Sequence, residues 1–239
     1  MAKETQPALS TRRALIELAI VVTFALGSKY ALDQVIWRYS GPISLITTLM
    51  LFSLYLWRRG DSWAAMGVRR LPGLKSKLLV LPQTLLAVVA IFACGNLAGL
   101  AGDQLGLWTY GETPAGVEAR WGAIEGNLPV YLFWLAITWT SAAFAEEMFF
   151  RGFLITRFRA ALASIPLSAV FAVVLAAAIF GYGHYYYQGV RGLANAGAIG
   201  LALGTLYLLY KGNLWPLILA HGLVDTLVFT ALYAGLDDA

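Results

Sequence analysis

The sequence places six ionisable side chains within stretches that are otherwise apolar. They are Glu146, Glu147, Arg151, His184, His221 and Asp225. Because lipid penalises charge, ionisable residues in such stretches favour a functional site over simple helix packing. Amide hydrolysis needs a base for water, a donor for the developing oxyanion and an acid for the leaving amine. These six residues can supply all three.

Spacing separates the roles of the two adjacent glutamates. Neighbouring positions on an α-helix diverge by about 100°, so Glu146 and Glu147 cannot point into the same space. Glu147 and Arg151 are four residues apart and lie on one face. We therefore expect a structural ion pair between Glu147 and Arg151, which leaves Glu146 without a local partner.

His184 is the partner that a helical hairpin would bring to Glu146. If the chain reverses at residues 164–166, the two residues lie almost equally far from the turn and face each other. We expect Glu146 to take a proton from water and pass it to the amine, while His184 positions the water. Space for a peptide beside them is predicted from the small residues Ala142, Ala143, Ala145, Gly181 and Gly183.

His221 and Asp225 form a second polar station. They are four residues apart on the last apolar segment, so they could pair with each other, face a common ligand or simply bridge helices. His184 also has a plain reading as an interfacial residue, since Tyr185, Tyr186 and Tyr187 beside it are typical of an aromatic belt.

The elements that carry these residues are predicted to be membrane-spanning helices. Of 239 residues, 59% are hydrophobic and 13% are charged, which excludes an ordinary soluble domain. The single Cys94 excludes an internal disulfide. The basic residues fall between apolar runs, so the net charge of +4 indicates no nucleic-acid partner.

We predict an all-α, polytopic transmembrane bundle of about seven to eight helices with a polar catalytic cavity inside it. Taking about 20 apolar residues for each span, the expected helices are 15–37, 42–57, 78–101, 128–150, 166–182, 193–210 and 214–234. Residues 149–163 could lengthen the fourth helix or lie along the interface as an eighth. Residues 1–127 would form the N-terminal helices with a basic loop, and residues 128–239 the catalytic core.

Loop charges predict the orientation in the membrane. The connection 58–77 carries Arg58, Arg59, Arg69, Arg70, Lys75 and Lys77. The connection 102–127 carries Asp103, Glu112, Glu118 and Glu125 against Arg120 alone. Positive charge favours the cytoplasm, so we expect a cytoplasmic N-terminus with Lys3, Arg12 and Arg13, an outer C-terminus with Asp237 and Asp238, and localisation in the cell membrane. Arg157 and Arg159 favour a site that opens on the cytoplasmic side.

Three motifs in order resemble the CAAX prenyl protease and bacteriocin-processing family of membrane-embedded enzymes, also called Abi or CPBP. They are "EEMFFR" from Glu146, "FGYGH" from Phe180 to His184 and "HGLVD" from His221 to Asp225, and the resemblance covers about residues 128–234. It implies a metal-free glutamate protease that cleaves a membrane-associated or lipid-modified peptide or protein. Glu146 and His184 would activate water, and His221 and Asp225 would stabilise the oxyanion.

The resemblance also implies that Glu147, Arg151 and Phe180 have a structural role next to the catalytic residues. Many proteolytic members have Asn where this chain has Asp225, and an ionised Asp cannot donate a hydrogen bond to an oxyanion. Asp225 would then orient His221 or act in its protonated form.

Other functions remain open on the residues alone. Two histidines with carboxylates also suit zinc, although HExxH is absent and no cofactor is the favoured expectation. A non-catalytic immunity or scaffold protein and a proton-coupled transporter are the alternatives to a protease. Against transport, the sequence has no repeated half with paired broken helices.

Overall fold

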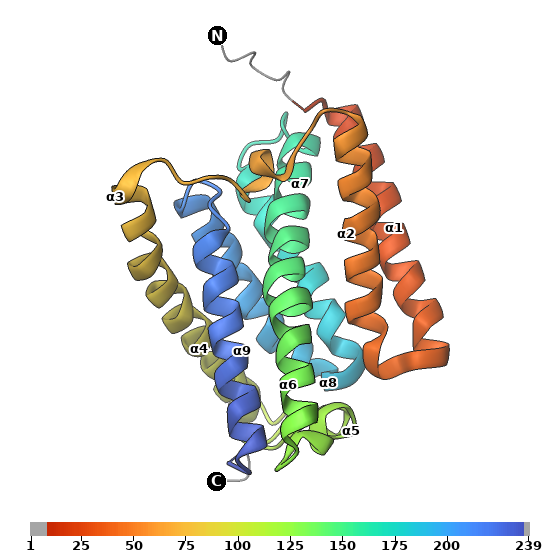
Figure 1. Cartoon of the computed structure of the whole chain (residues 1–239), viewed down its shortest axis with the longest axis vertical. Helices are drawn as coiled ribbons and strands as arrows, with labels where there is room; N and C mark the ends of the chain where they lie inside the picture. The colour runs from red at the N-terminus through yellow and green to blue at the C-terminus, as the bar shows by residue number, and fades with distance from the viewer. Residues whose placement is uncertain (1–8, 237–239) are drawn as a thin grey trace.

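The computed structural model describes residues 9–236, and all of the regular structure among them is helical (Figure 1). Five helical segments in this range are long and apolar enough to cross a membrane. They are Thr11–Arg58, Gly73–Gln104, Leu128–Ala161, Ser168–Leu209 and Trp215–Tyr233. The predicted fold class is confirmed: the protein is an all-α, multi-pass membrane protein.

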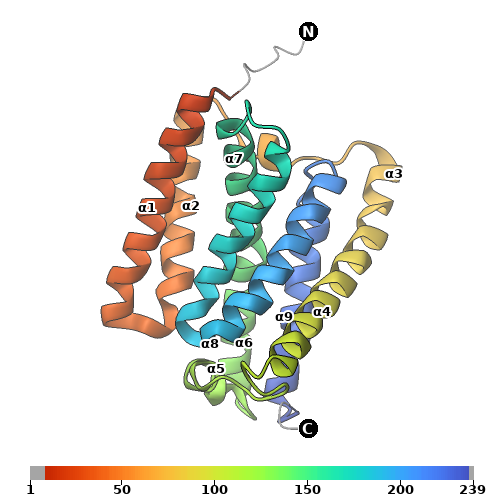
Figure 2. The same ribbon diagram turned by 180° about the vertical axis from the view of Figure 1, so that it is seen from behind.

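The predicted count of seven to eight helices is close but not exact, because two of the five segments fold back on themselves. Helices α1 (Thr11–Ile36) and α2 (Ser40–Arg58) are joined only by the 3-10 turn η1 (Trp37–Tyr39), and they run side by side in opposite directions (Figure 2). With no polar loop between them, the two predicted helices form one continuous helical segment.

Helix α8 (Ser168–Leu209) reverses in the same way at a single residue. Gly189 has φ 62° and ψ −153°, a backbone region that is essentially restricted to glycine. The two arms of α8 consequently lie next to each other (Figure 2). The predicted helices 166–182 and 193–210 fall on these two arms.

The central helix of the bundle changes its hydrogen-bonding pattern along its length. It begins as α6 (Leu128–Ile137), continues as a π-helix, η4 (Thr138–Ile155), and ends as α7 (Thr156–Ala161). Residues 149–163 therefore lengthen the fourth helix and do not form a separate interfacial one. π-helical turns bond i to i+5 and frequently occur at functional sites.

The two ends of the bundle differ in charge. The beginning of α1, the 3-10 turn η2 (Trp63–Met66) and α3 (Gly73–Leu78) lie at one end, whereas α5 (Ala115–Trp121) and the last turn of α9 (Trp215–Tyr233) lie at the other (Figure 1). The basic connection and the acidic connection are thus on opposite ends, as the predicted orientation requires. Lys3, Asp237 and Asp238, which entered that prediction, lie outside the described residues.

The acidic connection is more structured than a polar loop. After α4 (Val80–Gln104), the chain forms α5 and a 3-10 turn, η3 (Gly122–Ile124), which fold against the end of the bundle. Ile124 is fully buried there with Trp134 and Phe229. This packing carries Arg120, at the end of α5, into the interior.

Candidate active site

A cavity of about 450 Å³ lies inside the bundle, between α1, α2, α4, the central helix, α8 and α9, with α5 at one end. All four residues predicted to be catalytic line it: Glu146, His184, His221 and Asp225. Its walls include residues from both predicted regions of the chain, for example Lys29 and Glu146. The polar side chains of the central helix, α8 and α9, which are far apart in the sequence, therefore meet at one cavity.

Beside the cavity lies the predicted ion pair of Glu147 and Arg151. The Arg151 Nη1 atom donates to Glu147 Oε1 over 2.8 Å, and the two side chains are 2% and 0% exposed. The wider π-helical turn keeps positions four apart close enough to meet. This pair is placed as the spacing predicted.

The same glutamate holds His221, which the sequence did not predict. His221 Nδ1 lies 2.9 Å from Glu147 Oε1, and since an ionised carboxylate only accepts, Nδ1 is the donor. The other ring nitrogen, Nε2, lies 3.6 Å from Asp225 Oδ2. Glu147 therefore orients His221, and Asp225 lies within ion-pair distance of it.

Phe180 connects this ion cluster to His184. The Arg151 guanidinium lies 4.5 Å from the centre of the Phe180 ring, and the centre of the His184 ring lies 4.7 Å from the same point, with the two rings at 65°. The backbone oxygen of Phe180 accepts from His184 Nδ1 over 2.9 Å. Because a carbonyl oxygen cannot donate, this bond leaves Nε2 as the unprotonated nitrogen of a neutral His184.

Glu146 stands apart from these contacts. Within residues 9–236 it has no hydrogen bond or ion pair, and its side chain borders the cavity. The expected proximity to His184 takes the form of a shared cavity, with no direct hydrogen bond between them among the described residues. A carboxylate in this position has room for a water molecule or a substrate group.

The small residues serve two purposes. Ala142 and Gly183 border the cavity, as predicted. A Cβ at Gly181 would lie 2.6 Å from the backbone oxygen of Leu193, so this glycine permits the close approach of the two arms of α8. Ala143 and Ala145 are buried in the helix packing and do not line the cavity.

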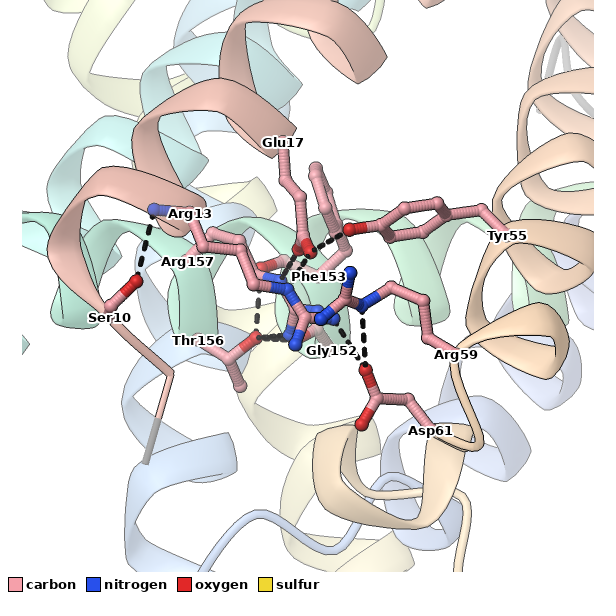
Figure 3. A network of polar contacts seen from close by, with 10 residues as sticks. All are labelled: Ser10, Arg13, Glu17, Tyr55, Arg59, Asp61, Gly152, Phe153, Thr156 and Arg157. Atoms are coloured by element: carbon pink, nitrogen blue, oxygen red, sulfur yellow. Dashed lines mark hydrogen bonds and ion pairs between the residues drawn. The ribbon is translucent and has the colours of Figure 1, made fainter. Parts of the chain in front are cut away.

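A second buried polar cluster lies at the basic end, around Glu17 of α1 (Figure 3). Glu17 Oε1 accepts from Arg13 Nε over 2.6 Å and from the Tyr55 hydroxyl over 2.9 Å. Glu17 Oε2 accepts from Arg157 Nε over 2.8 Å. Arg13 also pairs with Asp61 at 2.5 Å.

This cluster gives Arg157 a different place from the one expected, while the side on which the site opens stays a prediction. Arg157 is committed to Glu17, and neither Arg157 nor Arg159 borders the cavity. The cavity extends toward Lys29 and Arg120, at the end that carries α5. Arg157 links the end of the central helix to α1, and Arg159 is exposed.

Arg120 is the cavity residue that sequence reasoning missed, because it was counted only as a charge in a polar loop. It is 6% exposed, and its Nη1 atom donates to the Tyr186 hydroxyl. The signal in the sequence that could have indicated its burial was the group of aromatic residues beside it and at 185–187.

Among the described residues, no three His, Cys, Asp or Glu side chains are grouped so that they could hold a metal ion. His184 and His221 reach the cavity from different helices, and His221 Nδ1 is already bound to Glu147. Independence from cofactors and metals stays a prediction.

The protein is all-helical and has a glutamate and two histidines around an interior cavity. This arrangement is typical of membrane-embedded hydrolases, in which such groups act on a substrate within the membrane. Residues 128–227 match the family described as Rce1-like, type II CAAX prenyl endopeptidase. This match supports the CAAX protease family that the three motifs indicated. No curated protein and no solved structure matches the chain.

Proposed function

We propose that the protein is an intramembrane endopeptidase that hydrolyses a peptide bond of a membrane-associated protein, with Glu146 as the base. The observation that carries this proposal is the contrast between Glu146 and its neighbour. Glu147 is bound by Arg151 and His221, whereas Glu146 borders the cavity without a partner in the described chain. A free carboxylate is the group that can accept a proton from water.

In this proposal His184 positions the attacking water. Its Nδ1–H is held by the Phe180 carbonyl, so its Nε2 can accept a hydrogen bond from water. As the water oxygen attacks the carbonyl carbon, its proton moves to the Glu146 carboxylate. Glu146 then delivers this proton to the leaving amine when the C–N bond breaks.

His221 supplies the donor for the oxyanion. With Nδ1–H bound to Glu147, a second proton on Nε2 makes the ring a cation that can donate to the oxygen of the tetrahedral intermediate. The Asp225 carboxylate, 3.6 Å from Nε2, offsets this positive charge. Asp225 thus acts through His221. The hydrogen bond to the oxyanion comes from His221, so Asp225 itself does not have to donate one.

The orientation follows from the charges of the two ends. We place the basic end, with α3, at the cytoplasmic face of the cell membrane. The cavity then extends toward the outer face, where α5 lies. No cofactor is required for the steps above.

The test compares cells that produce the wild type, Glu146→Gln or His184→Ala at equal levels, by quantitative mass spectrometry of membrane-protein termini. We expect wild-type termini that disappear in both variants. The same termini in all three strains would refute the protease and favour a scaffold, while substrate flux into liposomes that Glu146→Gln abolishes would favour a transporter.

A further inference from the structure

Arg120 is a buried cation that has no carboxylate partner in the described part of the chain. Three arginines are buried in residues 9–236: Arg120, Arg151 and Arg157. Arg151 pairs with Glu147 and Arg157 with Glu17, but no acidic side chain of the described chain lies within ion-pair distance of Arg120. A buried charge without a counter-ion is costly, so this exception requires an explanation.

Its protein partners satisfy the guanidinium only in part. Nη1 donates to the Tyr186 hydroxyl, and Nε is buried without a hydrogen-bond partner in the described chain. Four aromatic rings, those of Trp121, Trp134, Tyr186 and Tyr187, lie within 5.9 Å of the guanidinium carbon. Cation–π contacts stabilise the charge, but they leave donors for an anion unused.

The guanidinium is also close to the proposed catalytic residues. It lies 5.1 Å from the centre of the Tyr187 ring, which lies 5.8 Å from the centre of the His184 ring. The guanidinium carbon is therefore at most about 11 Å from the His184 ring. An extended peptide covers about 3.3–3.6 Å per residue, so that distance spans about three residues.

We propose that Arg120 is a specificity-determining residue that binds a carboxylate of the substrate, no more than about three residues from the cleaved bond. This inference rests on the proposed function, since it takes the occupant of the cavity to be a peptide. The planar guanidinium matches a carboxylate better than an ammonium does, because it can donate two parallel hydrogen bonds. The carboxylate is either the free C-terminus or an Asp or Glu side chain of the peptide.

Binding is measured on the Glu146→Gln protein in lipid nanodiscs, because this variant should hold peptides without cleaving them. Three synthetic libraries of N-acylated hexapeptides serve as probes: free C-terminus without acidic residues, C-terminal amide with one Asp or Glu, and C-terminal amide without acidic residues. Mass spectrometry quantifies the retained peptides. We expect one carboxylate-bearing library to be retained about tenfold more than the neutral one, and that library identifies the source of the carboxylate.

Adding Arg120→Gln to the Glu146→Gln protein should remove this preference. Arg120→Lys keeps the positive charge but cannot donate two parallel hydrogen bonds, so it should retain part of the preference. Arg38→Gln is the matched control: Arg38 is exposed, donates to the Ala119 backbone oxygen over 2.9 Å and lies outside the cavity lining. It should leave the preference unchanged.

Equal retention of the three libraries, or a preference that survives Arg120→Gln in folded protein, would overturn the inference. Failure of the proposed function is distinguishable from this. A wild-type protein that retains carboxylate peptides through Arg120 but cleaves nothing would refute the protease and keep the carboxylate site.

Discussion

The molecule buries two clusters of charged residues, and they differ in how completely their polar atoms are used. Around Glu17, both carboxylate oxygens accept hydrogen bonds from Arg13, Arg157 and Tyr55. Around the cavity, Glu147 Oε2 and Arg151 Nη2 are buried without a hydrogen-bond partner in the described chain, and Glu146 has none there either. Saturated networks fix a structure, whereas of these three residues near the cavity only Glu146 borders it and can meet a ligand.

The same comparison separates the two glutamates of the first motif. Glu147 resembles Glu17 in that it is buried and bound by a cation. Glu146, one residue away, faces open space. Adjacent residues of the same type therefore differ in role because the helix turns them toward different partners.

The largest expected effect is on catalysis at Glu146. Glu146→Gln should lower kcat by about 10²–10⁴-fold, because an amide cannot take a proton from water, and should leave the thermal unfolding midpoint near that of the wild type. The measurement is single-turnover cleavage, by purified protein in nanodiscs, of the substrate found by terminus mapping.

Glu17→Gln is the matched control for that loss, since it makes the same substitution at a buried carboxylate outside the cavity. Folded Glu17→Gln protein should cleave at a rate similar to the wild type. If both variants lost activity equally, the distinction between the clusters would be wrong.

The next effect is on stability at Glu17. Glu17→Ala leaves Arg157 buried without its carboxylate, so the free energy of unfolding should fall by about 3–5 kcal/mol. Unfolding in mixed micelles of increasing denaturing detergent would measure this change. Glu112→Ala, which removes an exposed carboxylate, should change the unfolding free energy by no more than about 0.5 kcal/mol, and an equally small effect of Glu17→Ala would refute a stabilising role for its cluster.

A smaller effect is expected at Asp225. Asp225→Asn should keep kcat within about tenfold of the wild type, because a long ion pair contributes about 1 kcal/mol or less and an amide can still orient His221 by hydrogen bonding. Single-turnover rates test this directly. A loss as large as that of Glu146→Gln would show that the Asp225 carboxylate takes part in proton transfer.

No effect is expected from chelators. Activity should be the same before and after treatment with EDTA or 1,10-phenanthroline, because in the proposed mechanism Glu146 and His184 activate water without a metal ion. Loss on chelation with recovery on adding Zn²⁺ would replace the glutamate mechanism with a metal-dependent one.

The parts of the site that depend on local spacing could be predicted from the sequence. A distance of four residues predicted the contact of Glu147 with Arg151, and symmetry about a turn brought Glu146 and His184 to one cavity. The same spacing rule would have paired Arg13 with Glu17, which are also four residues apart, had that acidic residue in the first apolar run been considered.

The remaining features depend on tertiary packing. Nothing local to residues 102–127 indicates that α5 folds back and buries Arg120, or that His221 reaches Glu147 from 74 positions away. The π-helical pattern of η4 is also hidden, because an apolar run shows how long a helix is but not which carbonyl each N–H bonds. The reversal of α8 was expected between the predicted helices 166–182 and 193–210, but not that the single residue Gly189 makes it.

The reversal of α8 has a consequence for the synthesis of the protein. Its two arms are joined at one glycine, with no polar segment long enough to wait outside the membrane while the second arm is translated. We therefore expect the two arms to enter the bilayer together as a helical hairpin, because they pack directly against each other. His184 lies five residues before Gly189, so we expect the proposed water-positioning histidine to reach its final place only after the second arm is translated.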